Sequence, residues 1–566
     1  MKLFENLKGF LSSPKISPFV PKSVVCLMEG YSWKLFSHDL LAGITVGVIA
    51  LPLAMAFAIA SGLGPEKGIY TAVIAGFLNS LFGGSRFLIG GPTGAYVVLI
   101  FGIVQKYGYE GLVCATLEAA TLLFLLGFFK CGTLIKFIPY PVIVGFTSGI
   151  AILLISSQIN EFFGLHVPHA TADFVDKMRL GFEHASTASL DAILIAVFSL
   201  LFILVAKKKS KKFPGVIVAL ILATLVTLIF NLPVETIFTK FGQIPSTLPT
   251  PSLPSLSFDL FRKTFPDAVG IALLGAIESL LCAVIADSLT GTRHKSNCEL
   301  MAQGISNFGS IIFGGIPSTG AIARTTASLQ FQAKTPLAGI IHALTLLLLM
   351  LVLAPYASLI PLAALAAVLV SVGINMFEFE EMKDLVKGFR GDALIMLATL
   401  AITVFVDLNA AVQTGVLLSI VLFLKKTTES TRGKIYHAIE EEEALGNGDL
   451  GGSWQMTLPP DTKVYEIEGP LFFGVSDMLS DVFRFLETLP KTLIIRMRSV
   501  PFIDSTGINA LEHFVETCHA KKVNLYLCEL NDDVLASLEK AEFFEHFPKE
   551  RVIQSIEMAV TPPPFV

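Results

Sequence analysis

Gly90–Ala95 (GGPTGA) and Gly315–Ala321 (GIPSTGA) are two short, similar segments that interrupt apolar stretches in the two halves of the chain. In each segment a proline removes one backbone hydrogen-bond donor and disfavours helical geometry in the residue before it. The neighbouring glycines allow the chain to turn sharply. We therefore predict that each segment breaks a helix and that a new helix begins just after it.

The chain as a whole has the composition of an integral membrane protein. Of its 566 residues, 53% are hydrophobic and 15% are charged, and the mean hydropathy is +0.70. Soluble domains carry about 25% charged residues, so a simple soluble enzyme, a disordered protein or a nucleic-acid-binding protein is excluded. The seven cysteines form no CxxC pair, and we expect neither a metal site nor a disulfide framework.

About fourteen apolar stretches are candidate membrane spans, and several are too short to cross a ~30 Å hydrocarbon layer alone. They lie near residues 40–60, 69–83, 88–105, 109–130, 138–160, 191–206, 214–230, 266–287, 299–314, 316–332, 336–354, 358–376, 391–408 and 410–426. Basic residues gather in alternate loops, most strongly at Lys207–Lys212. The positive-inside rule then predicts an even number of spans, with both termini in the cytoplasm. We expect an α-helical polytopic protein of the cytoplasmic (inner) membrane, embedded in the lipid bilayer.

The two Gly/Pro segments fall in the third and tenth candidate spans, which is the same position in two halves of seven spans. Because seven is odd, the second half would be inverted in the membrane relative to the first. Broken helices at matching positions of inverted halves are typical of a transporter's binding site. Helix N-termini present free N–H groups and a partial positive charge, so two of them meeting at mid-membrane would bind an anion. The alternative is that both segments are ordinary kinks, since glycine and proline are common in membrane spans. The matched pair favours a site.

Polar side chains near these breaks are candidates for the site. Thr93 and Thr319 offer hydroxyl groups as helix caps or as ligands. Arg324 lies about one helical turn beyond Gly320 and would add positive charge, since a basic side chain at mid-membrane needs a cavity or a partner. Glu278 is a carboxylate in the middle of the eighth span, where it could carry a proton or pair with Arg324.

Two further polar residues in the spans favour structural roles. Glu118, in the fourth span, is expected to hydrogen-bond between helices. His342, in the eleventh span, is expected to be packed and hydrogen-bonded rather than to relay protons.

The C-terminal part of the chain has a different composition. Residues 427–455 are charged and glycine-rich, which is typical of a linker. In residues 456–566, short strands such as 463–467 and 492–497 alternate with helical patterns such as 507–520, which predicts a small soluble α/β domain. The expected order is thus an N-terminal segment (1–38), a transmembrane domain (39–426), the linker and this domain.

Several motifs resemble those of a known family. Asp39–Pro52, Gly64–Tyr70, Gly91–Gly94 and Thr290–Lys295 are similar to segments of the SulP anion transporters, solute carrier family 26. Asp504–Gly507 is similar to the signature loop of the STAS domain at the C-terminus of that family. The resemblance implies a seven-plus-seven inverted repeat divided into core and gate domains, elevator-like alternating access and a homodimer. It also implies that the STAS domain is cytoplasmic.

In the family the anion lies between the half-helices of the third and tenth spans, with a residue of the eighth span beside it. By motif match, the resemblance implies a substrate site built from the residues around the two breaks, with Glu278 as the proton-coupling residue. The site residues are Thr93, Gly94, Ala95, Thr319, Gly320, Ala321 and Arg324.

The substrate and the coupling ion are inferred from the same comparison. Sodium-coupled bicarbonate members carry Asp and Thr where this chain has Glu278 and Cys282, and a Thr near the position of Ile322. A hard cation prefers oxygen ligands, so sodium coupling is not expected. The eighth span also resembles bacterial C4-dicarboxylate carriers, which implies proton-coupled uptake of succinate, fumarate or aspartate. The alternatives are sulfate or bicarbonate transport, or an uncoupled anion channel or exchanger.

The C-terminal domain is expected to regulate the transporter or support its dimer. In soluble relatives of the STAS fold, the serine that matches Ser505 is a phosphorylation site; alternatively Asp504 and Ser505 cap the next helix. A cytoplasmic protein partner at this domain and a membrane-tethered sensor are further hypotheses. The spans offer no nucleophile–base set, so we expect neither an enzyme nor a cofactor.

Overall fold

The computed structural model describes residues 17–133, 139–167, 171, 173–209, 214–247, 250–251, 257–406, 408–436, 461–474, 478–479, 482–483, 488–556 and 558. Residues 1–16, the end of the Lys207–Lys212 run and linker residues 437–455 lie outside this description. The chain divides into two compact units, Met1–Leu417 and Leu418–Val566, which are described separately below.

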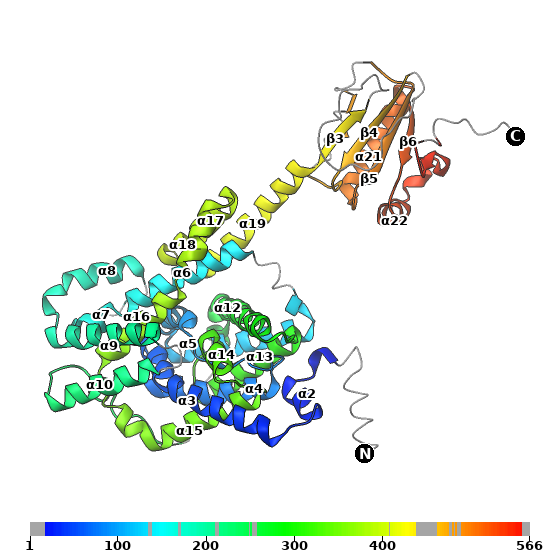
Figure 1. Cartoon of the computed structure of the whole chain (residues 1–566). Coiled ribbons are helices and arrows are strands. Elements are labelled where there is room, and N and C mark those ends of the chain that lie inside the picture. The colour runs from blue at the N-terminus through cyan, green and yellow to red at the C-terminus, as the bar shows by residue number, and fades with distance from the viewer. Residues whose placement is uncertain are drawn as a thin grey trace. The chain divides into compact units, whose positions relative to one another are not determined.

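The first unit is almost entirely helical (Figure 1). The description begins with a 3-10 turn (Ser17–Phe19) and the short helix α2 (Lys22–Met28). Eight helices of the chain are long and apolar enough to cross a membrane, judged by length and composition among the described residues. The remaining elements, in chain order, are α3 (Trp33–Ala60), α4 (Pro65–Phe82), β1 (Gly90–Gly91), α5 (Gly94–Phe128), α6 (Tyr140–Ser157), α7 (Ile159–Phe163), α8 (Phe174–Glu183), α9 (Leu190–Lys209), α10 (Gly215–Ile229), α11 (Ile237–Phe241), α12 (Phe258–Thr290), α13 (Ser296–Ile312), β2 (Thr319–Gly320), α14 (Ile322–Gln330), α15 (Leu337–Ala357), α16 (Leu362–Met376), α17 (Phe379–Lys387), α18 (Arg390–Phe405) and α19 (Leu408–Ser430).

These elements match the fourteen apolar stretches closely, while the number of spans stays a prediction. The third and fourth stretches share the label α5 but are two helical segments, separated by a kink at Gly108 (φ 68°). The short helices α8, α11 and α17 were not expected from the sequence. Their polar, mixed composition gives no apolar stretch, so the hydropathy pattern does not reveal them.

The helices of the first unit form two packing groups. Helices α3, α4, α5, α12, α13 and α15 make most of their contacts with one another. Helices α6, α9, α10, α16 and α18 form the second group in the same way. The two Gly/Pro segments, β1 and β2, both belong to the first group, because β1 contacts α4 and β2 contacts α12.

Small residues allow the helices of the first group to pack closely. A Cβ at Gly68 of α4 would lie 1.9 Å from the carbonyl oxygen of Ala54 in α3. A Cβ at Gly43 of α3 would lie 2.6 Å from the carbonyl oxygen of Ala338 in α15. Close backbone approach through glycine and alanine is how membrane helices gain contact area, since lipid competes with any apolar side chain.

The second unit contains a five-stranded sheet in the order β3-β4-β5-β6-β7. Strand β3 is antiparallel to β4, and the other neighbours are parallel. The bounds are β3 (Arg432–Tyr436), β4 (Thr462–Glu468), β5 (Thr492–Ser499), α21 (Ser505–Ala520), β6 (Asn524–Cys528), α22 (Asp532–Lys540) and β7 (Val552–Ile553), with 3-10 turns at Phe543–Glu545 and Lys549–Arg551. Alternate strand residues such as Leu493 and Ile495 pack with Leu511 and Phe514 of α21. This is the predicted α/β domain, but its first strand, β3, lies in the segment 427–455 that the composition predicted to be a linker.

The contact at Gly68 gives a testable prediction. Gly68→Ala places a methyl group against a backbone carbonyl that cannot rotate away, so we expect it to destabilise the protein by about 1–3 kcal/mol. Gly102→Ala, in α5, is the matched control because nothing lies within 4 Å of the added Cβ. The measurement is the temperature at which half of the detergent-purified protein loses its monodisperse elution peak. Equal midpoints for the two variants would contradict the close α3–α4 contact.

Candidate functional site

The two Gly/Pro segments pair directly with each other. Strands β1 and β2 are antiparallel, with Gly90 opposite Gly320 and Gly91 opposite Thr319. The Ala321 N–H also donates to the Ile89 carbonyl, with an N···O distance of 2.9 Å. Helices α5 and α14 begin just after these strands, at Gly94 and Ile322. Because the strands run in opposite directions, the N-termini of two half-helices are brought to a common place.

Glycine is required at the centre of this pairing. Gly91 has φ +152°, a conformation that residues with a side chain rarely adopt. A Cβ on Gly91 would lie 2.1 Å from Nη1 of Arg324. A Cβ on Gly320 would lie 2.9 Å from Cδ1 of Leu88 and 3.1 Å from Cα of Ser279. The two glycines therefore let both the arginine and α12 approach the strand backbones.

Helix α12 fixes β2 through Ser279, a buried residue that the sequence analysis did not single out. The Gly320 N–H donates to Ser279 Oγ at 3.0 Å, and Ser279 Oγ lies 2.7 Å from Thr319 Oγ1. Thr319 Oγ1 also donates to the Gly275 carbonyl at 3.2 Å. The Thr319 hydroxyl, expected as a cap or ligand, is thus engaged with α12, as is the amide of Gly320. A serine in an apolar helix gives no pattern from which this role could be found.

Arg324 is buried at the start of α14, with 4% of its surface exposed. Its Nη2 donates to the Pro92 carbonyl at 3.0 Å. Its Nη1 is buried and has no hydrogen-bond partner among the described residues. The ion pair with Glu278, considered from the sequence, does not form between these two described residues. The structure therefore places an uncompensated guanidinium beside the strand pair.

Thr93 and Glu278 lie together on the accessible side of the strand pair. The Thr93 hydroxyl donates to Glu278 Oε2 at 3.2 Å, and both residues are partly exposed. Thr93 is the N-cap residue of α5, yet its side chain makes no cap hydrogen bond to the helix. Ala321, the N-cap residue of α14, has no side chain that could cap one. The first-turn amides of both helices are therefore left without a side-chain cap, which is the arrangement that binds anions.

Gly94 and Ala95 form the buried first turn of α5. A Cβ on Gly94 would lie 3.2 Å from both Leu154 Cδ2 and Met376 Sδ. Leu154 belongs to α6 and Met376 to α16, both in the second packing group. The first turn of α5 is thus the place where the second group covers the strand pair.

The two residues assigned to structural roles have different surroundings. Thr264 of α12 donates its hydroxyl to Glu118 Oε2 at 3.2 Å, so Glu118 does hydrogen-bond between helices. His342 of α15 is packed in the core as expected. However, neither of its ring nitrogens has a hydrogen-bond partner among the described residues, so the expectation of a hydrogen-bonded histidine is wrong.

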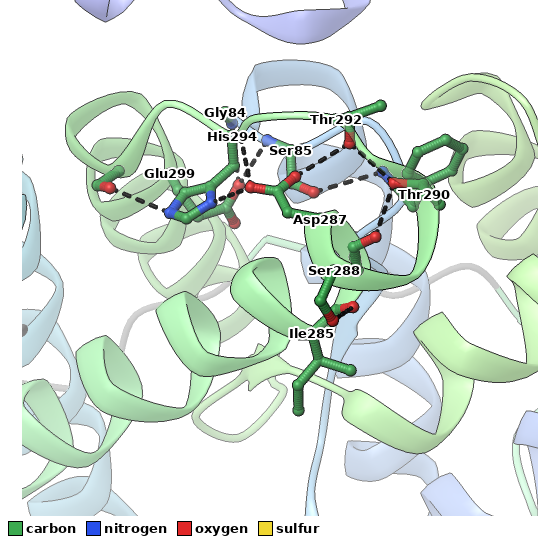
Figure 2. Close-up of polar contacts among 12 residues, drawn as sticks. Gly84, Ser85, Ile285, Asp287, Ser288, Thr290, Thr292, His294 and Glu299 are labelled. Carbon is green, nitrogen blue, oxygen red and sulfur yellow. Dashed lines mark hydrogen bonds and ion pairs between the residues drawn. The ribbon is translucent and has the colours of Figure 1, made fainter. Parts of the chain in front are cut away.

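The Thr290–Lys295 motif forms a closed network of polar contacts between α12 and α13 (Figure 2). Asp287 Oδ2 accepts from the His294 N–H at 2.8 Å and lies 2.7 Å from His294 Nδ1. Asp287 Oδ1 accepts from the Thr292 hydroxyl at 3.0 Å. His294 Nε2 lies 3.0 Å from Ser296 Oγ. The partners come from the end of α12 (Asp287), the loop after it (Thr292 and His294) and the start of α13 (Ser296), so the motif stiffens the turn between these two helices.

Glu299 connects that loop to the one before β1 (Figure 2). Its fully buried carboxylate accepts from the N–H groups of Gly84 and Ser85, at 2.9 and 3.1 Å. Its other oxygen accepts from Asn79 Nδ2 at 3.0 Å and Gln303 Nε2 at 3.2 Å. Four donors on one carboxylate compensate its burial. Glu299 therefore holds the chain on its path from α4 into β1.

In the second unit, Asp504 rather than Ser505 caps the helix that follows. Asp504 Oδ1 accepts from the Gly507 N–H at 2.8 Å, and Oδ2 accepts from the Phe473 N–H at 3.2 Å. Ser505 is the first residue of α21 and is exposed. An exposed hydroxyl at a helix N-terminus is accessible to modification, so the phosphorylation hypothesis for Ser505 stays open.

Comparison with known proteins now places the chain. The model of the sulfate permease family matches residues 36–399. The chain belongs to the sulfate permease family. The STAS domain model matches residues 453–559, so this integral membrane anion transporter carries a C-terminal STAS domain.

Two relatives and one solved structure illustrate the family membership. The chain is 42% identical to the "Putative sulfate transporter YvdB" of Bacillus subtilis (strain 168) over 92% of this chain and 97% of the relative. It is 31% identical to the bicarbonate transporter BicA of Picosynechococcus, over 92% and 94% of the two chains. The structure of the murine Slc26a9 anion transporter in the inward-facing state aligns with a TM-score of 0.85 at 20% identity, covering 97% and 94%. That likeness shows a common permease fold.

Glu299 gives the next prediction. Glu299→Gln keeps the shape of the side chain but replaces one carboxylate oxygen with an NH2 group. That group would face the N–H donors that now bond to the oxygen. We expect a loss of about 2–4 kcal/mol of stability, because hydrogen bonds to a buried charge are lost and their partners are left unpaired. Thermal unfolding of purified protein measures this. Glu183→Gln, in an exposed pair with Arg179, is the control and should shift stability by less than about 0.5 kcal/mol.

Asp504 and Ser505 give a paired prediction in the permease's STAS domain. Asp504→Ala removes the N-cap of α21 and should destabilise this unit by about 1 kcal/mol. Ser505→Ala should leave its stability unchanged, since the side chain of Ser505 makes no cap hydrogen bond. The two variants are compared by urea unfolding of the full-length protein. The readout is the urea concentration at which residues 461–556 become sensitive to limited proteolysis. Equal sensitivity would mean that Asp504 is not the effective cap.

Proposed function

We propose that this chain is a secondary active transporter of a small inorganic oxyanion, with sulfate as its substrate. The observation that carries this proposal is the buried Arg324 guanidinium, whose Nη1 has no partner among the described residues. It stands where two helices begin without side-chain caps. A buried charge of this kind is costly unless an anion compensates it. The proposed site is built from Thr93, Gly94, Ala95 and Arg324, together with Thr319, Gly320 and Ala321, which are bonded to α12 and β1 and hold the second helix start in place.

The relatives support an inorganic anion. Their names specify sulfate for the Bacillus relative and bicarbonate for BicA, with the higher identity to the former. These names favour the sulfate or bicarbonate alternative of the sequence analysis over succinate, fumarate and aspartate, and the dicarboxylate hypothesis is therefore replaced. In this structure Cys282 Sγ lies 3.3 Å from Thr325 Oγ1. Cys282 stands where the sodium-coupled members that the chain resembles carry a threonine, and a hard cation prefers oxygen to a thiol. This supports a transporter that does not depend on sodium.

Glu278 is the proposed coupling residue. It receives a hydrogen bond from Thr93, next to the helix starts where the anion would lie. An ionised carboxylate there would repel the anion, and protonation would remove that repulsion. Binding of a proton and binding of sulfate would then favour each other. This links an inward proton gradient to anion uptake.

The two packing groups suggest how the site is exposed to each side in turn. The first group would be the core domain that carries the anion, and the second would be the gate domain. Leu154 and Met376 of the gate cover the first turn of α5. Sliding of the core past these side chains would open the site on one side at a time, which is the elevator mechanism. A homodimer with both termini in the cytoplasm, and a protein partner at the STAS domain, belong to the same proposal.

The test is uptake of labelled sulfate into sodium-free proteoliposomes with an inward proton gradient. We expect saturable uptake that is inhibited by excess unlabelled sulfate and unaffected by succinate. Bicarbonate as competitor distinguishes the second candidate substrate, which BicA supports. Uncoupled, non-saturating flux would instead indicate a channel, and binding without flux would indicate a sensor.

Two variants test the proposed residues. Arg324→Gln should lower sulfate uptake at least roughly tenfold, since truncating one partner of a buried charged contact costs about 2–5 kcal/mol. Arg324→Lys keeps the charge and should retain more uptake than Arg324→Gln. Glu278→Gln should abolish the response to the proton gradient while sulfate exchange at equal pH persists. Gradient-driven accumulation by Glu278→Gln would rule out its coupling role.

A further inference from the structure

A cavity of about 250 Å³ lies beside α5. Its wall includes Val97 and Phe101 of α5, together with Asn160, Glu161, Lys177 and Lys240 from the short helices α7, α8 and α11. Val97 lies three residues beyond Gly94, which is about 4.5 Å along the helix at 1.5 Å per residue. The cavity therefore reaches to within one helical turn of the start of α5.

Three charged side chains line the cavity, and the structure pairs two of them with each other. Lys240 forms an ion pair with Glu161, so these two groups balance each other. Lys177 has no ion pair or side-chain hydrogen bond among the described residues, and its Nζ lies 5.7 Å from the centre of the Phe101 ring. The cavity thus holds one positive charge in excess, on a half-buried side chain.

We propose that this cavity is an anion-concentrating vestibule, in which the ammonium group of Lys177 binds a small oxyanion before the anion reaches the helix starts. A cleft lined by one sign of charge, with apolar walls, raises the local concentration of the opposite ion. The apolar wall formed by Val97 and Phe101 excludes water and so limits the screening of the Lys177 charge. Because the ligand is the transported anion, this inference rests on the proposed function.

The charge of Lys177 is itself sensitive to pH. Burial lowers the pKa of Lys177 to about 8, while the nearby Asp173 carboxylate opposes this shift. The other charged groups that line the cavity are Lys240 and Glu161, which pair with each other. Below pH 8 Lys177 is mainly protonated and attracts anions. As the pH rises through 8 it becomes neutral and the attraction is lost.

The experiment is exchange of labelled sulfate across proteoliposomes that have the same pH on both sides, so that no proton gradient acts. Lys177→Gln should raise KM for sulfate about three- to tenfold with a change in the maximal rate of less than about twofold. Arg179→Gln is the matched control: it removes one positive charge from the same helix, but Arg179 is exposed and paired with Glu183. An unchanged KM in Lys177→Gln, or an equal rise in Arg179→Gln, would overturn the vestibule.

The pH dependence provides a second readout. In the wild-type protein KM should rise between pH 7 and pH 9, because Lys177 loses its proton there. Lys177→Arg should keep a low KM over the whole range, since a guanidinium stays protonated. A wild-type KM that does not change with pH, or the same rise in Lys177→Arg, would contradict the assignment to Lys177.

A third measurement does not depend on transport, so failure of the proposed function can be told apart from failure of the vestibule. Asn160→Cys places a thiol in the cavity, in a Cys131→Ser background because the other native cysteines are buried. The ratio of its modification rates by the anionic 2-sulfonatoethyl and the cationic trimethylammonioethyl methanethiosulfonates reports the local potential. Adding Lys177→Gln should lower this ratio about three- to tenfold. An unchanged ratio overturns the vestibule, whereas absent sulfate exchange with a lowered ratio overturns only the substrate.

Discussion

Backbone N–H and C=O groups inside an apolar layer must be hydrogen-bonded, and this requirement governs the centre of the permease domain. Two helices are interrupted there, at Gly90–Gly91 and at Thr319–Gly320, and each break would leave several polar groups unpaired. Pairing the two breaks as antiparallel strands satisfies part of this demand. Side chains satisfy more of it: Asn307 bonds both the N–H and the carbonyl of Ser318, at 2.7 and 2.9 Å. Thr71 Oγ1 accepts from the Ile316 N–H at 2.7 Å.

The backbone groups of the two strands are hydrogen-bonded, whereas the helices that follow them begin without a side-chain cap. Thr93 directs its hydroxyl to Glu278 instead of capping α5, and Ala321 cannot cap α14. The Gly320 N–H is thus hydrogen-bonded to Ser279 Oγ. The first N–H groups of α5 and α14, in contrast, have no side-chain cap. One short region thus combines a hydrogen-bonded strand pair with helix N-termini that carry no side-chain cap. Arg324, held through the Pro92 carbonyl, adds to the same field.

Much of the fold could be predicted from the sequence, because proline, glycine and long apolar runs have strong local effects. The two breaks, the helix starts after them and the α/β nature of the C-terminal domain follow from such local rules. The pairing of β1 with β2 does not, since strands of two residues have no periodicity. Ser279 and Asn307 also escape notice, because small polar residues in membrane helices are common and their partners depend on tertiary contacts. Lys177 lies in a short polar helix, α8, whose packing against α6 and α18 no hydropathy pattern shows.

The pairing of β1 with β2 joins residues that are about 230 positions apart in the chain. The strand pair therefore cannot form while the polypeptide is still emerging from the ribosome with only its first half inserted. During that interval Gly90 and Gly91 have no strand partner, and the amide of Ile89 lacks Thr325, to which it later donates at 3.0 Å. The centre of the membrane domain can therefore close only after residues 319–325 have been inserted. In a chain truncated before residue 319, the backbone groups of Gly90 and Gly91 would therefore lack their strand partners and would have to bond to water or to a chaperone.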